Sequence, residues 1–360
     1  MYEGDWNPHL STYGTVPLYA LILARLVVLL PQALVLGDWP SASFLTAEHA
    51  SVTYTVGRVL SAAFSAASIL VFYRIGCRLY CARVGLLTAA MVATTVSLIQ
   101  AAHYATVDSM LIFFLALGFL QAINILQRGT ARDYVLAGVC LALALAVKLP
   151  ALFLLPVLVA AHLYNHKRPA WRGKVERGLA RRFFDRRLLY LALSAVCVFA
   201  LTSPYAVLDF RSHYLSGANL NASRNVKLAF FEPFQTWTLA YKGLTPYVYE
   251  TTTLLFYGMG VGIEAASIIG LLYLAYRRRR QDLLVLAWVI PFFAVIGLSQ
   301  VKTIRYILPL MPFLAICGAA WLDSLARWRR LQGAKWLSAA AIALALGASL
   351  FYATAFANLY

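Results

Sequence analysis

Charged side chains are scarce in this sequence. Asp, Glu, Lys and Arg make up only 12% of its 360 residues, whereas 62% of the residues are hydrophobic. A soluble domain carries roughly a quarter charged residues and about half apolar ones, so the composition excludes a soluble fold. The sequence also lacks a hydrophilic block long enough to form a separate domain. It therefore predicts a polytopic membrane protein, embedded through most of its length.

Acidic residues are scarcer still, because 14 of them stand against 31 Lys and Arg, for a net charge of +17. Such a charge can indicate nucleic-acid binding. Here the basic residues are interleaved with apolar runs, so membrane topology and contact with anionic lipids explain them first, and no nucleic-acid partner is expected. The five cysteines lie in apolar segments or at a cytosolic edge, which is typical of packing residues and not of disulfides.

Several familiar catalytic motifs are missing from the sequence. It contains no Walker A sequence, no nucleotide-binding glycine motif, no HExxH and no serine-nucleophile elbow. Candidate functional residues must therefore come from isolated polar side chains close to the membrane.

Ten apolar runs approach or reach the roughly 20 residues that a crossing helix needs. They are residues 54–73, 84–102, 109–126, 134–147, 149–164, 188–202, 247–276, 283–299, 304–322 and 336–357. The fold class that follows is all-α, with about ten transmembrane helices and one N-terminal interfacial helix. Pro150 suits the first turn of the fifth run, because proline is tolerated where a helix begins.

The links between these runs predict the orientation. Basic residues cluster in alternate links, which together hold 22 of the 31 Lys and Arg: 74–83, 128–132, 167–187, 277–280 and 327–335. If the ten runs alternate, all of these links lie on one side, and the positive-inside rule makes that side cytosolic. We therefore expect a multi-pass protein of the plasma (inner) membrane whose remaining links face the exterior or periplasm.

The N-terminal region is expected on the external side. Residues 1–24 contain no Lys or Arg, but they contain Glu3 and Asp5. The apolar run 17–36 cannot cross if both of its flanks are external, and Arg25 suits a helix that lies in the outer interface. An external N-terminus predicts a further membrane helix upstream of Met1.

Charged residues near the predicted external side are expensive to place in a membrane, so each requires an explanation. Asp108 opens a span, where it acts either as a carboxylate favoured by the helix dipole or as an active-site acid. Arg58 either snorkels or binds a phosphate. Lys148, Lys302 and Arg305 are cations on the side that disfavours them, and a lipid phosphate would account for their presence.

Six short segments occur in a recognisable order along the chain. They are Asn7-Pro8-His9 with Val16-Pro17-Leu18-Tyr19, Gly57-Arg58 through Ser61, His103-Tyr104 through Asp108, Leu143 through Lys148-Leu149-Pro150, Ser203-Pro204-Tyr205 through Asp209, and Arg305-Tyr306 through Pro312. Together they resemble the type C membrane glycosyltransferases, in the branch of dolichyl-phosphate-mannose–protein mannosyltransferases and aminoarabinose transferases.

The resemblance implies an enzyme of the cell envelope that moves a hexose or pentose from a polyprenyl-phosphate donor to a protein, lipid or glycan acceptor on the external face. Residues 1–53 would be an external loop with the interfacial helix. Residues 54–360 would form the transmembrane domain, with an external loop at 203–246.

The resemblance also implies roles for individual residues. Asp108 and His103 would be catalytic, and the donor phosphate would be bound by Arg58, Lys148, Lys302 and Arg305. The general base of the family lies in an acidic motif upstream of the first matching segment, so we expect it before Met1, with Asp5 or Glu3 as substitutes in this chain. A divalent metal cation is the one candidate cofactor.

Two alternatives stay open. A transporter or flippase of a lipid-linked sugar would need polar groups along a path through the bilayer, and Glu264 is the only acid deep in a predicted span. A truncated, inactive glycosyltransferase is the other alternative, since the expected base is not among residues 1–360.

Overall fold

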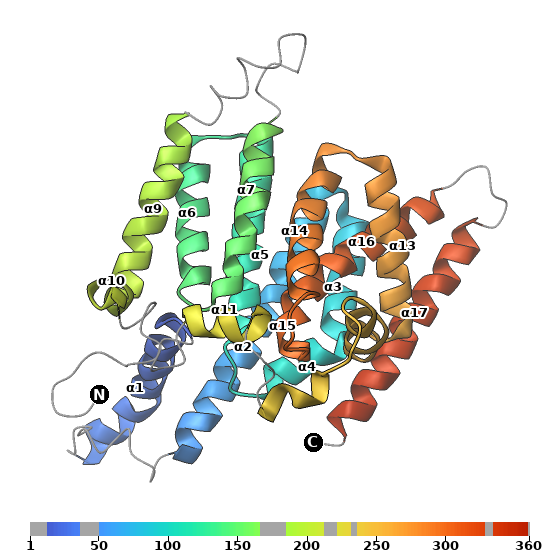
Figure 1. The fold of residues 1–360 in the computed structure, drawn as a ribbon. Helices are drawn as coiled ribbons and strands as arrows, with labels where there is room; N and C mark the ends of the chain where they lie inside the picture. The colour runs from blue at the N-terminus through green and yellow to red at the C-terminus, as the bar shows by residue number, and fades with distance from the viewer. Residues whose placement is uncertain are drawn as a thin grey trace.

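The described part of the protein is a bundle of helices that contains no β-strand (Figure 1). The computed structural model describes residues 13–36, 50–165, 185–211, 222–231, 236–327 and 334–358. The helices, with 3-10 segments written η3, η5 and η7 and a π-helical one written η6, are α1 (Val16–Leu36), α2 (Ala50–Leu79), α3 (Ala82–Thr94), α4 (Val96–His103), α5 (Asp108–Gln127), α6 (Ala131–Leu145), η3 (Leu149–Phe153), α7 (Leu154–Leu163), α9 (Arg186–Thr202), α10 (Pro204–Leu208), α11 (Ala222–Phe230), η5 (Thr236–Tyr241), η6 (Glu250–Leu255), α12 (Phe256–Met259), α13 (Val261–Arg277), α14 (Arg280–Ile296), α15 (Ile304–Ile307), η7 (Leu308–Leu310), α16 (Met311–Ala326) and α17 (Ala334–Ala357). The prediction of an all-α polytopic protein is confirmed.

Four helical stretches among the described residues are long and apolar enough to cross a membrane by themselves. They are Ser51–Leu79, Asp108–Gln127, Ile304–Ala326 and Trp336–Ala357. The pair α3 and α4 adds a fifth if the two bent helices count as one span. The remaining runs are shorter helices of the same bundle. Helices suit this environment because each satisfies its backbone hydrogen bonds within its own segment.

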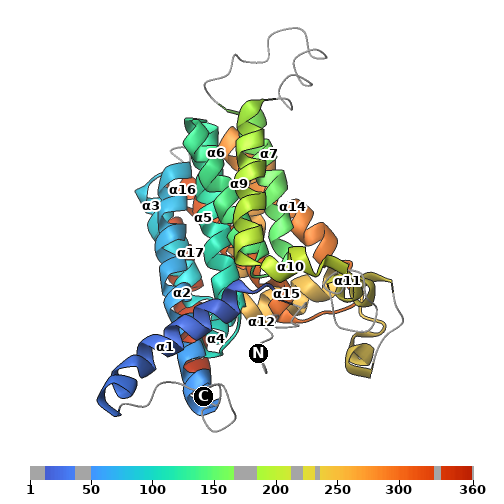
Figure 2. The same cartoon turned by 90° about the vertical axis from the view of Figure 1, so that its left-hand side faces the viewer.

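The long helices alternate in direction, and this alternation sorts the links between them. The links α2–α3, α5–α6 and α13–α14 lie together at one end of the bundle, at the top of Figure 1. We call this the basic end, because it carries Arg78, Arg128 and Arg277–Arg280. The starts of α5 and α15 lie at the opposite end, where α1 runs obliquely to the bundle (Figure 2). The placement of α1 in a membrane interface stays a prediction.

Two of the predicted spans are broken by bends. The run 84–102 bends by 58° between α3 and α4, where Thr95 is extended. The continuous span predicted for 247–276 is wrong, because Gly260, with φ 80°, ends α12 and starts α13. This backbone conformation is open to glycine and strained for other residues. As a consequence Glu264, predicted deep in a span, lies in the first turn of α13.

Small residues bring α13 and α16 into close contact. A Cβ at Gly270 would collide with the backbone of Cys317, and one at Gly318 would approach the amide of Ser267 at 3.1 Å. Glycines of this kind let helix backbones approach each other in membranes, where packing drives association. These contacts hold α16 in the centre of the bundle, with most of its residues buried.

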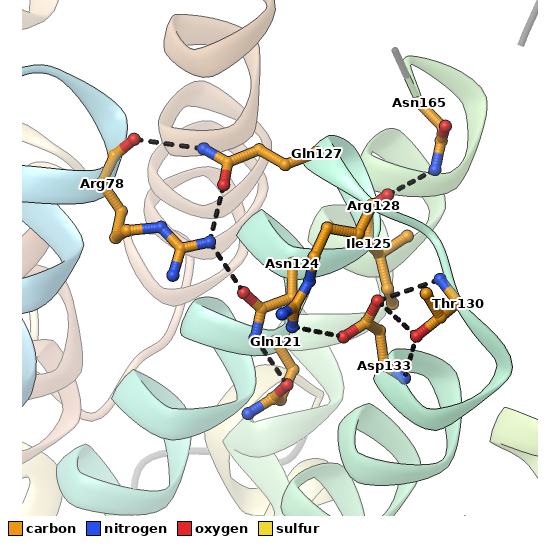
Figure 3. A network of polar contacts seen from close by, with 9 residues as sticks. All are labelled: Arg78, Gln121, Asn124, Ile125, Gln127, Arg128, Thr130, Asp133 and Asn165. Atoms are coloured by element: carbon orange, nitrogen blue, oxygen red, sulfur yellow. Dashed lines mark hydrogen bonds and ion pairs between the residues drawn. The ribbon is translucent and has the colours of Figure 1, made fainter. Parts of the chain in front are cut away.

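The basic end is fastened by polar contacts that Figure 3 shows from close by. Thr130 caps α6 through Asp133, and the carboxylate of Asp133 also binds Arg128 at 2.7 Å. Arg78 on α2 donates to the side chain of Asn124 on α5 at 3.0 Å. These contacts hold the ends of α2, α5 and α6 together at the basic end. They therefore help to fix the position of α5, whose opposite end is Asp108.

Candidate functional site

Asp108 is the first residue of α5, and its side chain has two cationic partners. One carboxylate oxygen, Oδ1, accepts from Lys148 Nζ at 2.8 Å, and the other, Oδ2, accepts from Arg305 Nε at 2.8 Å. The residue has no exposed surface. Its carboxylate therefore acts neither as a lone helix-dipole partner nor as a simple cap, and it holds two segments of the chain against α5.

Lys148 reaches this carboxylate from the link between α6 and η3, where its backbone is extended. Pro150 occupies the first turn of η3, as the sequence predicts. The ammonium group also faces two aromatic rings, those of Tyr306 at 5.2 Å and Tyr13 at 5.9 Å. Cation–π contacts of this kind stabilise a cation with little water around it.

Arg305 comes from the first turn of α15, and 44% of its side chain is exposed. The side chain of Lys148 is 11% exposed. We call Asp108, Lys148 and Arg305 the charge triad. With one carboxylate and two cations it carries a surplus positive charge that is reachable on the Arg305 side, and such a site attracts an anion.

Residues 13–16 lie beside the triad and contact both the link before η3 and the end of α9. The amides of Gly14 and Val16 donate to the carbonyls of Val147 and Ala146, and Thr15 contacts Ser203 Oγ at 3.0 Å. A Cβ at Gly14 would collide with the Ala146 backbone, which explains glycine there. This segment places Tyr13 over Lys148.

Arg58 and His103 lie beside the link that leads into Asp108. Arg58 Nε on α2 donates to the backbone oxygen of His103 at 2.6 Å, and Ser61 Oγ donates to the backbone oxygen of Thr106 at 3.0 Å. Both Arg58 and His103 are exposed. The structure therefore gives Arg58 a bracing contact with this link, and its phosphate-binding role and the catalytic role of His103 stay predictions.

Lys302 does not join the charge triad, although it lies three residues before Arg305. Its Nζ donates to Glu250 of η6 and to the carbonyl of Gly297, at 3.2 Å for the second bond. Both charged side chains are almost fully buried. Glu250 is hard to recognise in the sequence because it stands near the start of an apolar run, although an acid and a lysine in neighbouring apolar segments are a signal for a buried pair.

Glu3 and Asp5 lie outside the described residues. Within the described ranges, no group of three or more His, Cys, Asp or Glu side chains could hold a metal ion. Each oxygen of Asp108 already accepts a hydrogen bond from a cation, and the two positive charges beside this carboxylate disfavour a metal cation there.

A comparison with protein families matches residues 15–208 to the family of dolichyl-phosphate-mannose-protein mannosyltransferases. The match covers more than half of the chain and includes Asp108 and Lys148. No curated protein matches the sequence.

Among solved structures, the chain is similar to ArnT from Cupriavidus metallidurans, with a TM-score of 0.58 and 15% identity in the apo state. For the same protein bound to undecaprenyl phosphate the values are 0.60 and 16%. Each likeness covers 98% of this chain, and 67% and 68% of the ArnT chains. The oligosaccharyltransferase AglB from Archaeoglobus fulgidus, in complex with an inhibitory peptide and a dolichol-phosphate, gives a TM-score of 0.53 at 14% identity over 98% of this chain and 52% of its own. At these identities the likeness shows a common fold.

Proposed function

The chain belongs to the dolichyl-phosphate-mannose-protein mannosyltransferase family, and from this premise we propose that it transfers a sugar from a polyprenyl-phosphate donor to an acceptor hydroxyl. The observation that carries the proposal is the charge triad at the end opposite the basic links. The positive-inside rule makes that end external or periplasmic. A lipid-linked donor suits that location, because the lipid brings the activated sugar to the membrane surface. A protein or a glycolipid serves as the acceptor.

In the proposed reaction the acceptor oxygen attacks the anomeric carbon of the donor sugar. A bond forms between that oxygen and carbon, and the bond from the carbon to the phosphate oxygen breaks with inversion. The phosphate takes the bonding electrons and leaves as polyprenyl phosphate. The proton of the acceptor passes to a carboxylate outside the described residues, for which Asp5 and Glu3 are the candidates in this chain.

Within this reaction the two cations of the triad stabilise the charge that develops on the leaving phosphate. Arg305 is the better exposed of the two and makes the first contact, and Lys148 supports it from the more buried side. Each oxygen of Asp108 accepts a hydrogen bond from a cation, so the carboxylate is turned towards Lys148 and Arg305 and not towards an acceptor hydroxyl. We therefore assign Asp108 to positioning the two cations, and not to acting as the base.

Donor binding tests the proposal directly. We expect Lys148→Met and Arg305→Gln each to weaken the binding of undecaprenyl phosphate to the detergent-solubilised protein by tenfold or more. A charge-assisted hydrogen bond contributes about 1.5–3 kcal/mol, and 1.4 kcal/mol is a factor of ten.

Lys242→Met is the matched control, because Lys242 is an exposed cation in the turn after η5 and lies outside the triad. Its dissociation constant for undecaprenyl phosphate should equal that of the wild-type protein. Equal affinities for the wild type and both triad variants would refute the phosphate assignment.

A further inference from the structure

Outside the charge triad, the pair Glu250–Lys302 is the most completely buried pair of opposite charges among the described residues. The side chains are 2% and 3% exposed. Glu250 Oε1 accepts from Lys302, and Glu250 Oε2 has no hydrogen-bond partner. Burying two charges is expensive, and such a pair is weak evidence for stability by itself, so another role has to explain why it is present.

The pair fastens the link from residue 297 to residue 303, which leads directly into Arg305. Lys302 stands at the end of the link, and its Nζ donates both to Glu250 of η6 and to the carbonyl of Gly297 at the start of the link, at 3.2 Å for the second bond. Both ends of the link are therefore held at η6. The middle of the link is held from the other side, because the amide of Gln300 donates to the Ala229 carbonyl of α11 at 2.7 Å. The position of Arg305 relative to Asp108 therefore depends on where η6 holds Lys302.

Local backbone geometry directs Glu250 towards this link. Glu250 begins a π-helical turn, a form that is rare and frequent at functional sites. Just before it, Tyr247 adopts a positive φ of 64°, which is costly for a side chain of this size. The Tyr247 hydroxyl donates to the Ala294 carbonyl at 2.8 Å, so the same turn also supports the end of α14.

We propose that Glu250 is a positioning residue for sugar transfer, which acts through Lys302 and the 297–303 link to hold Arg305 against Asp108. This inference rests on the proposed function of the charge triad. It also changes the role of Lys302. A buried lysine neutralised by Glu250 adds little charge to a phosphate, so Lys302 belongs to the support of the site and not to the phosphate contact.

A double-mutant cycle tests the proposal with undecaprenyl phosphate as the probe. Glu250→Gln keeps the shape of the side chain and removes its charge, and we expect it to weaken binding about tenfold. In an Arg305→Gln background the same change should have almost no further effect, because its influence passes through Arg305. Independent, multiplying losses in the double variant would overturn the proposal.

Asp133→Asn is the matched control for the loss of a buried ion pair. Asp133 is buried and paired with Arg128, but it lies at the basic end. The control should lower the melting temperature and leave the dissociation constant unchanged. If Glu250→Gln fails to fold, Glu250→Gln/Lys302→Met replaces it, since removing both charges leaves no unpaired charge in the interior. The double variant should fold and still bind about tenfold more weakly.

Hydrogen exchange separates failure of this inference from failure of the proposed function. In Glu250→Gln the amides of residues 297–306 should exchange faster than in the wild type, with those of 146–148 unchanged, whether or not the protein binds a donor. Unchanged exchange in 297–306 would refute the positioning role. The other outcome is that the wild-type protein does not bind undecaprenyl phosphate, while Glu250→Gln still speeds exchange in residues 297–306. That result would refute the proposed function and leave Glu250 as the support of the link.

Discussion

Asp108 illustrates at the scale of one residue why a carboxylate persists in an apolar bundle. It has no exposed surface, so its charge is sustained only by Lys148 and Arg305. Each partner in turn depends on Asp108, because removing one member of a buried set leaves an uncompensated charge. The stability and the proposed phosphate binding of this site therefore depend on the same three side chains.

We expect Asp108→Asn to lower the free energy of unfolding by about 3–5 kcal/mol, the usual cost of breaking a buried ion pair. A mere helix cap would lose only about 0.5–2 kcal/mol. Thermal unfolding in detergent measures the difference, and sugar transfer measured on the same preparation should fall by orders of magnitude.

The partner variant Asp108→Asn/Lys148→Met provides the control for this experiment. It should recover part of the lost stability, because fewer cations are left without a counter-charge, but it should not recover transfer. A single Asn variant that is both stable and active would contradict the role given to Asp108.

The sequence indicates which residues belong to the site, but not which of them pair with each other. Asp108, Lys148 and Arg305 stand out because charges near a membrane are rare, and all three meet in space. Their pairing was not predictable, since Asp108 lies 40 residues from Lys148 and 197 from Arg305. Proximity in sequence groups Lys302 with Arg305, whereas in the structure Lys302 lies before α15 and pairs with Glu250, and Arg305 lies in α15 and pairs with Asp108.

At the scale of the elements, the break at Gly260 decides how the C-terminal half of the bundle is built. It separates α12 from α13 and lets α17 pack closely, because a Cβ at Gly260 would meet Ser349 Oγ at 3.0 Å. Hydropathy did not reveal this break, since the residues on both sides are apolar and only the backbone angle of Gly260 distinguishes a bend from a straight span.

Gly260→Ala should destabilise the protein by about 1–3 kcal/mol, because alanine is strained at this positive φ. Gly347→Ala is the control on α17, where a Cβ would meet nothing within 4 Å. It should be neutral or stabilise the helix by up to roughly 1 kcal/mol. The measurement is the melting temperature of each variant in the same detergent. Equal melting temperatures for Gly260→Ala and Gly347→Ala would contradict the role assigned to Gly260.

At the scale of the whole molecule, the alternation of long helices was predictable because basic links mark every second turn of the chain. The described basic links do gather at one end of the bundle (Figure 1). Hydropathy also predicts the runs that form α6, α9, α13 and α14, but these helices are only 15 to 17 residues long, shorter than the roughly 20 residues of a full crossing.

The orientation in the membrane is tested by reporter fusions. A fusion after Arg279 should report the cytosol, and one after Gly243, an open turn beyond η5, should report the exterior. Two further informative positions, Arg182 and Asn219, lie outside the described residues. An external signal from the fusion after Arg279 would invert the proposed arrangement.

The wide spacing of the charge triad has a consequence for biosynthesis. Translation proceeds at about 5–20 residues per second, so Asp108 leaves the ribosome roughly 10–40 s before Arg305, which follows it by 197 residues. Lys148 follows Asp108 by 40 residues, or about 2–8 s, and from then until Arg305 is made the nascent pair of Asp108 and Lys148 is neutral. The surplus positive charge appears only after Arg305 has been inserted, so the proposed phosphate site is incomplete in any nascent chain that stops before residue 305.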